Sequence, residues 1–87
     1  MANVHLPTTL TPLFPGLERH QEVDAATVDE AIDRLEEQWP GLRDRLCEPG
    51  PALRRHIHAY VDGERAQLDT PLADGSRVDV IAAISGG

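Results

Sequence analysis

Lysine is absent from this sequence, cysteine occurs once, and tryptophan, tyrosine and phenylalanine occur once each. Because all eight basic residues are arginine, no side-chain amine is available for an isopeptide bond, and the chain cannot be conjugated to itself through lysine. The single cysteine, Cys47, cannot form an internal disulfide or hold a structural zinc ion by itself. No apolar run approaches the roughly 18 residues of a membrane span, and the N-terminal residues do not form an export signal. We therefore expect a cytoplasmic protein.

Negative charge predominates over positive charge. The 87 residues include 15 acidic and 8 basic side chains, so the formal net charge is −7. This surplus opposes contact with nucleic-acid phosphates and with anionic lipid surfaces. A chain of this length forms one domain and buries a small core, which cannot enclose a large cofactor. The composition therefore argues against nucleic-acid binding, membrane binding and a large resident cofactor.

The strongest local signal is an amphipathic helix that begins after Thr27. Thr27 and Glu30 have the spacing of a capping box, in which the hydroxyl accepts an early backbone N–H and the carboxylate reaches back to the cap. Apolar residues at helical spacing then predict one buried stripe: Val28, Ala31, Ile32, Leu35 and Trp39. Pro40-Gly41 ends this helix, and residues 42–47 predict a short second helix.

Alternating apolar and polar residues predict strands on both sides of the helices. The first two are expected at residues 2–6 and 17–23, with a proline-rich loop between them. A strand at residues 53–61, a tight turn at Asp62-Gly63 and a short following strand indicate a hairpin, and the last strand covers residues 77–83. This order indicates an α+β fold. We expect a β-grasp domain at residues 1–83, with a mixed sheet whose first and last strands are parallel neighbours and whose one face is covered by the main helix.

The same alternation predicts which side chains face away from the helices. His5, His58, Tyr60 and Ile81 should share the open face of the sheet, together with His56. A solvated face favours charged residues or threonine at the position of Ile81. An apolar and an aromatic residue on one exposed face suit the centre of a protein interface. We therefore interpret this face as a partner-binding surface.

Two glycines follow directly after the last predicted strand. Gly86 and Gly87 add no side chain to a core and lose much entropy on ordering. We therefore expect residues 84–87 to form a flexible tail. Such a tail can pass through a channel too narrow for side chains and present the carboxylate of Gly87 to the active site of another protein. For the tail alone, a frayed terminus without function is the alternative interpretation.

These features together resemble the ThiS/MoaD type of ubiquitin-like sulfur carriers, which are small β-grasp proteins that end in Gly-Gly. The resemblance covers essentially the whole chain and rests on HIHAYVDGE at residues 56–64, LADGSRVDV at residues 72–80 and AISGG at residues 83–87. Within the family, the short second helix and the added length look more like the actinobacterial cysteine-biosynthesis carriers and MoaD than the shorter thiamin carrier. One difference is visible: relatives commonly end in Ala-Val-Ala-Gly-Gly, whereas Ile84 and Ser85 stand here.

The resemblance implies a chemistry that partners perform on this chain. An E1-like adenylating and sulfurtransferase enzyme of the MoeB/MoeZ/ThiF type would use ATP to adenylate the carboxylate of Gly87, and a sulfur donor would convert it to a thiocarboxylate. A second enzyme would accept the sulfur, in cysteine biosynthesis or a related pathway. The carrier would be a monomer when free, without a catalytic residue, a metal or a permanently bound cofactor. Its partner interface would comprise Ile81, Tyr60, His58, His5, Ile84 and Ser85.

Other functions stay open at this point. The small subunit of molybdopterin synthase would use the same tail inside a large subunit, a ubiquitin-like modifier would join its terminus to lysines of other proteins, and a small binding module would use no terminal chemistry. A metal site formed by His5, His56 and His58 is a weaker hypothesis, because exposed strand histidines without a carboxylate at fixed spacing are usually solvated. Cys47 is interpreted as a small packed residue and Trp39 as part of the core.

Overall fold

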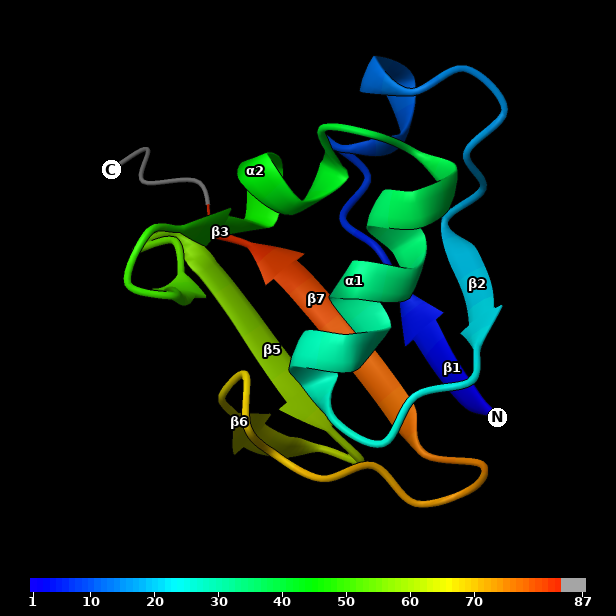
Figure 1. Cartoon of the computed structure of the whole chain (residues 1–87), viewed down its shortest axis with the longest axis vertical. Helices are drawn as coiled ribbons and strands as arrows, with labels where there is room; N and C mark the ends of the chain where they lie inside the picture. Colours follow the sequence, from blue (N-terminus) through cyan, green and yellow to red (C-terminus); the bar gives the residue numbers. More distant parts are fainter. Residues whose placement is uncertain (84–87) are drawn as a thin grey trace.

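The structure, a computed structural model, describes residues 1–83. These residues fold into a five-stranded sheet with helices on one face (Figure 1). Figure 1 shows α1 lying across one face of the sheet, with α2 following it. The elements in chain order are β1 (Ala2–His5), the 3-10 helix η1 (Thr11–Leu13), β2 (His20–Val23), α1 (Val28–Gln38), α2 (Leu42–Leu46), β3 (Cys47–Glu48), β4 (Ala52–Leu53), β5 (Ile57–Val61), β6 (Glu64–Ala66) and β7 (Arg77–Ala82). Even α1 has only 11 residues, and no helix in this part of the chain is long and apolar enough to cross a membrane.

The first and last strands are parallel neighbours in the middle of the sheet. The strand order is β2-β1-β7-β5-β6, and β1 runs parallel to β7 with Val4 opposite Val78, whereas the other neighbours are antiparallel. A parallel pair needs a long crossover connection, which the elements between β1 and β7 supply. The hairpin turn joins β5 to β6 with positive φ at Asp62 (50°) and Gly63 (88°), as its sequence predicts. The predicted β-grasp is thus confirmed.

The core lies between α1 and the sheet. The buried residues of α1 are Val28, Ala31, Ile32 and Leu35, and they pack in one cluster with strand residues such as Val4, Ala59, Val78 and Val80. The Thr27 hydroxyl accepts the Glu30 N–H at 3.1 Å, which confirms half of the predicted capping box. The Glu30 carboxylate accepts the Ala26 N–H at 3.0 Å, whereas the capping box predicts the N–H of the next residue, Thr27. Trp39 is half-buried at the C-cap of α1 and packs against the core.

The start of α2 has no side chain of its own to cap it. Gly41 occupies the N-cap with a left-handed backbone (φ 97°), which glycine adopts without steric cost. The Glu36 carboxylate of α1 replaces the missing cap, because it accepts the Gly41 N–H at 3.0 Å and the Arg43 N–H at 2.8 Å. The Arg43 guanidinium in turn donates to Asp29 at 2.6 Å and to Asp33 at 2.9 Å. These bonds fasten α2 to α1.

The single strand predicted at residues 53–61 is wrong, because the chain turns inside it. Leu53 ends β4 and pairs with Cys47 of β3 in a separate two-stranded ribbon. The Arg54 N–H then bonds the Leu46 carbonyl at 2.9 Å, and the Ile57 N–H bonds the Arg54 carbonyl at 2.9 Å, which closes a turn before β5. The alternation of side-chain positions in the sequence, Leu53, Arg55 and Ile57, continues through this turn although residues 54–56 are not in a strand. His56 consequently lies outside the sheet.

The other predicted boundaries shift by one to three residues. β2 begins at His20 and not at residue 17, because the chain is still in a turn at Leu17, whose N–H bonds the Phe14 carbonyl at 3.0 Å. The first strand, the second helix and the last strand each end one residue earlier than expected. The predicted loop at residues 8–16 contains η1, whose first turn holds Pro12. Such ends fray, so these shifts leave the topology unchanged.

Candidate partner-binding surface

The open face of the sheet carries one row of side chains that crosses all five strands. In register, the row consists of His20, His5, Asp79, Tyr60 and Arg65. His58 and Ile81 face each other on β5 and β7, on the same side as this row. The prediction that His5, His58, Tyr60 and Ile81 share the face opposite α1 is therefore confirmed.

Ile81 is the large apolar side chain that this face exposes. It is 48% exposed, and among residues 1–83 only Met1 and Leu13 are other large apolar residues of this kind. Ile81, Tyr60 and His5 line one shallow hollow of about 370 Å³, which Arg77 and Asp79 also border. The Arg77 Nε donates to the Asp79 carboxylate at 3.0 Å, so these two charges largely satisfy each other. The hollow therefore offers an apolar and aromatic centre beside a paired charge.

The histidines of this face form a stacked pair. The rings of His5 and His20 lie 4.8 Å apart and 14° from parallel, and the His20 Nε2 is 3.1 Å from the Asn3 Oδ1. Burial lowers the pKa of His5, and the positive charge of Arg77 lowers it further. A lowered pKa keeps His5 neutral at physiological pH. The His58 Nδ1 is buried and has no hydrogen-bond partner among residues 1–83.

The remaining sequence candidates are not brought together into a catalytic or metal site. β7 separates His5 on β1 from His58 on β5, and His56 lies in the turn before β5. Within residues 1–83 no group of three His, Cys, Asp or Glu residues could hold a metal ion. Cys47 is only 5% exposed, and burial raises the pKa of its thiol. A buried thiol with a raised pKa is a poor nucleophile, which confirms its interpretation as a packed residue.

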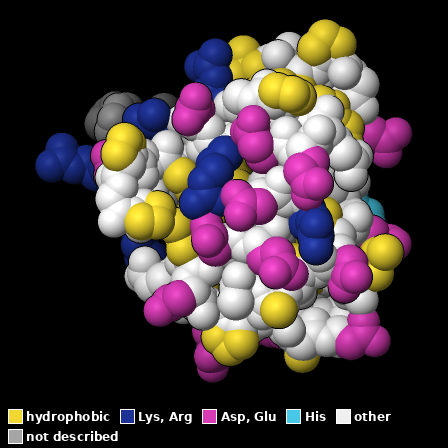
Figure 2. Space-filling view, viewed as in Figure 1, with side chains coloured by type: hydrophobic (Ala, Val, Ile, Leu, Met, Phe, Trp, Pro, Cys, Tyr) yellow, Lys and Arg dark blue, Asp and Glu magenta, His cyan; other side chains and the backbone are white. Residues whose placement is uncertain are grey.

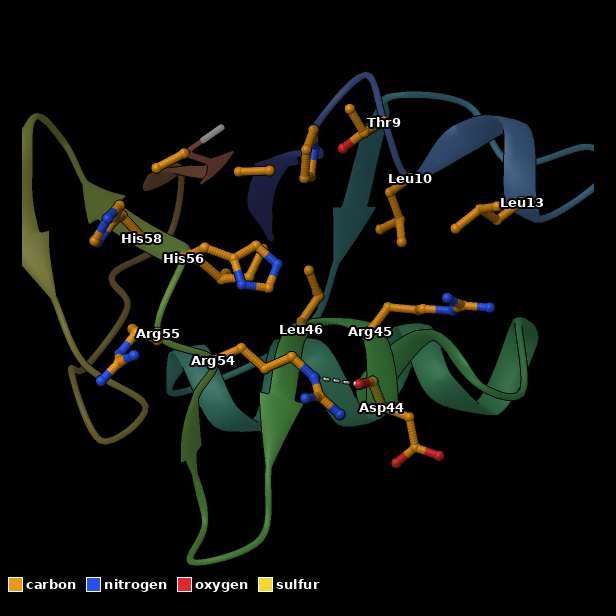
Figure 3. A pocket seen from close by; sticks show the side chains of 14 residues that line it. Thr9, Leu10, Leu13, Asp44, Arg45, Leu46, Arg54, Arg55, His56 and His58 are labelled. Carbon is orange, nitrogen blue, oxygen red and sulfur yellow. Dashed lines mark hydrogen bonds between the residues drawn. The ribbon is translucent and has the colours of Figure 1, made fainter. Parts of the chain in front are cut away.

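A cavity with a largely basic rim, which the sequence pattern did not predict, lies at the end of the sheet where the described chain stops. Ala83, whose N–H bonds the His56 carbonyl at 2.7 Å, borders this cavity of about 950 Å³. Arg45, Arg54 and Arg55 also line it (Figure 3). The predicted site residues Ile84, Ser85, Gly86 and Gly87 lie outside the described residues. The available signal was the run of two arginines and a histidine at residues 54–56 in a chain with a net charge of −7.

Comparisons with known proteins cover 74% of the chain or more and agree with one another. The model of the ThiS family matches residues 4–87. Sulfur carrier protein CysO of Mycobacterium tuberculosis is 31% identical over 90 residues, which cover 97% of this chain and 96% of the relative. A chain in the crystal structure of the Amycolatopsis orientalis BexX/CysO complex superposes with a TM-score of 0.88 at 32% identity and covers 100% of both chains. Small archaeal modifier protein 3 of Haloferax volcanii is 37% identical over 68 residues, which cover 74% of this chain and 73% of the relative.

Proposed function

Since this chain belongs to the ThiS family of small sulfur carriers and ubiquitin-like proteins, we propose that Gly87 carries sulfur as a terminal thiocarboxylate. The observation that carries this proposal is the family match, which extends to Gly87 together with the carrier fold. The likeness to CysO at 31% identity supports cysteine biosynthesis as the destination of the sulfur. In this scheme the chain is a substrate of its partner enzymes, and its folded domain is the part that those enzymes bind.

The chemistry requires activation because a carboxylate is a poor acyl donor. An E1-like enzyme binds ATP, and an oxygen of the Gly87 carboxylate attacks the α-phosphorus while pyrophosphate leaves. The resulting acyl adenylate has a good leaving group. The outer sulfur of a cysteine persulfide on a donor protein then attacks the carbonyl carbon and displaces AMP, which gives an acyl disulfide. A second thiol of the donor attacks the donor sulfur of that S–S bond, forms a disulfide with it and releases the thiocarboxylate. ATP is a substrate of the activating enzyme and not a resident cofactor of this chain.

The open face of the sheet is the proposed docking surface for that enzyme. Ile81 and Tyr60 provide an apolar and aromatic centre, and His5 contributes a ring whose lowered pKa favours the neutral form. A mostly uncharged centre with a polar rim suits a protein interface. Ile84 and Ser85, next to the reactive end, are proposed to follow Gly86 and Gly87 into the enzyme. The assembly of a CysO-type chain with BexX in the Amycolatopsis structure supports a protein partner, without identifying the adenylating enzyme.

The decisive experiment is intact-mass spectrometry of the full chain after coexpression with the adenylating enzyme from the same genome. We expect a species heavier by the exchange of one oxygen for one sulfur, which disappears in a variant without Gly86-Gly87. An Ile81→Asp variant should form less of it at equal expression, whereas Arg34→Glu on the opposite face is the control. No mass gain with an enzyme that consumes ATP in the presence of the chain would refute the thiocarboxylate.

A second candidate function is protein modification, which the similarity to a small archaeal modifier protein favours. In that case the Gly87 carboxyl would be joined to lysines of other proteins. Because this chain has no lysine, it could not form chains of itself through lysine side chains. Peptide mass spectrometry of cells that express the tagged chain separates the two functions. A branched Gly-Gly remnant on lysines of other proteins would support modification, and its absence together with the thiocarboxylate would support the carrier alone.

A further inference from the structure

The arginine-lined cavity beside Ala83 has an apolar floor and a basic rim. Leu10 and Leu46 are buried side chains of the floor, and Figure 3 shows them pointing toward one another from the N-terminal segment and from the end of α2. Leu13, which is 50% exposed, forms part of the wall. Arg45, Arg54 and Arg55 border this apolar part together with one aspartate, Asp44, so arginine predominates on the rim. The cavity is therefore shaped for an apolar group with negative charge around it.

The three rim arginines, like Arg19 and Arg65, have no ion pair with a carboxylate of residues 1–83. Arg34, Arg43 and Arg77 each pair with an aspartate or glutamate. At the cavity, the Arg54 Nε donates only to the Asp44 carbonyl at 2.7 Å. Arg45 and Arg55 are exposed. Figure 2 shows acidic side chains over the face of α1, with arginines at the upper left edge, where α2 and β3 lie in Figure 1. A local positive region thus stands on a chain with a net charge of −7.

The position of this region decides which protein would meet it. Gly87 is four residues beyond Ala83, and a four-residue segment spans at most about 14 Å. An enzyme that holds Gly87 in its active site must therefore place the rim of that site within this distance of the cavity. The cavity is separate from the hollow at Ile81 and Tyr60, because the two share no lining residue.

We propose that the cavity receives an apolar side chain flanked by aspartate or glutamate residues on the adenylating enzyme, next to the entrance of its active site. This inference rests on the proposed function, since it takes its partner from it. The apolar side chain fills the floor between Leu10, Leu13 and Leu46, and the flanking carboxylates face Arg45 and Arg55. The charges steer the encounter and fix its register, while the apolar contact excludes water.

The test measures the Kd between the full chain and the purified adenylating enzyme from the same genome, without ATP, at low and at high salt. Arg45→Glu and Arg55→Glu should each weaken binding by about tenfold at low salt, and the loss should shrink as salt screens the charges. The matched control is Arg34→Glu, which changes the net charge by the same amount on the helical face and should alter the Kd by less than about twofold. Leu13→Ser should weaken binding at both salt concentrations, because it removes apolar contact.

Every other outcome contradicts the proposal that the cavity binds the adenylating enzyme. Equal losses in Arg55→Glu and Arg34→Glu would show general charge repulsion, and unchanged binding in both rim variants would show that no acidic segment sits there. Absence of binding by the unaltered chain would also overturn the proposal. Circular dichroism and urea unfolding of each variant show whether it is folded. Thiocarboxylate formation is scored separately by intact mass, so that the carrier function and the docking site can fail independently.

Discussion

Two arginines of the same short helix, Arg43 and Arg45, have opposite surroundings. The side chain of Arg43 is 24% exposed and donates to Asp29 at 2.6 Å and to Asp33 at 2.9 Å. Arg45, two positions later, is exposed and forms no ion pair with a carboxylate of residues 1–83. The same residue type therefore holds the α1–α2 corner together in one case and leaves a charge available in the other. Stability and partner binding should depend on different members of this pair.

The largest effect is expected for Arg43→Ala. This change removes both charge-assisted hydrogen bonds and leaves Asp29 and Asp33 near each other without a cation. Such bonds at a partly buried position contribute about 2 kcal/mol in total, and alanine itself favours the helix, so the cost comes from the lost contacts. Urea unfolding measures it. Arg34→Ala, which breaks an exposed pair at 3.4 Å with Glu37, is the control and should cost under about 0.5 kcal/mol. Equal costs for the two variants would contradict the role given to Arg43.

Cys47 offers a second measurement of the same corner. It directly follows α2, is 5% exposed and has a thiol whose pKa is raised by burial. A thiol reagent can reach it only when this region opens. Arg43→Ala should accelerate labelling of the native protein by about thirtyfold, in line with the lost stability, whereas Arg45→Ala should leave the rate within about twofold. Acceleration by both variants to the same extent would mean that the two arginines support α2 alike.

The cap of α2 gives a smaller effect that depends on pH. The N–H groups of Arg43 and Gly41 donate to the Glu36 carboxylate and lower its pKa from the usual 4.5. A carboxyl whose pKa is lower in the folded state stabilises the fold above its unfolded pKa, and this contribution is lost as pH falls through the folded pKa. Glu36→Gln should therefore cost about 1 kcal/mol at neutral pH and much less in acid.

Urea unfolding of the unaltered chain and of Glu36→Gln, at neutral pH and below about pH 4, tests whether the cost of the substitution depends on pH. Glu37→Gln is the matched control, because Glu37 is an exposed neighbour on α1, and it should cost under about 0.5 kcal/mol at neutral pH. A cost for Glu36→Gln that stays constant into acid would show that the carboxylate charge does not stabilise the start of α2.

The sequence predicted the parts of the molecule that depend on neighbours along the chain. The capping residue Thr27, the buried stripe of α1 and the face shared by Tyr60 and Ile81 follow from helical and strand periodicity. The break before Ile57 was missed because the alternation of side chains continues through the turn. The two-residue strands that pair Cys47 with Leu53 are too short to leave a pattern.

The missed charge arrangements depend on residues that are distant in sequence. Arg43 lies 14 residues from Asp29 and 10 from Asp33, so no local spacing identifies its partners. The cavity collects Arg45 from α2, Arg55 from the turn before β5 and Leu13 from the N-terminal segment. Only the folded sheet brings these segments to one end. Sequence periodicity therefore predicts the sheet and its main helix, and the topology is needed to find the charges that lie near Ala83.

The smallest effect is expected for Arg45→Ala and Arg55→Ala, and it completes the contrast with Arg43. Removing either charge relieves repulsion between neighbouring arginines but also raises the net negative charge of the chain, and these two effects oppose each other. The free energy of unfolding should thus change by less than about 0.5 kcal/mol, as for other exposed charges. A loss above about 1 kcal/mol in urea unfolding would show that Arg45 or Arg55 supports the fold as Arg43 does. The rim charges would then have a structural reason to be there, and the argument that they serve a partner would lose its basis.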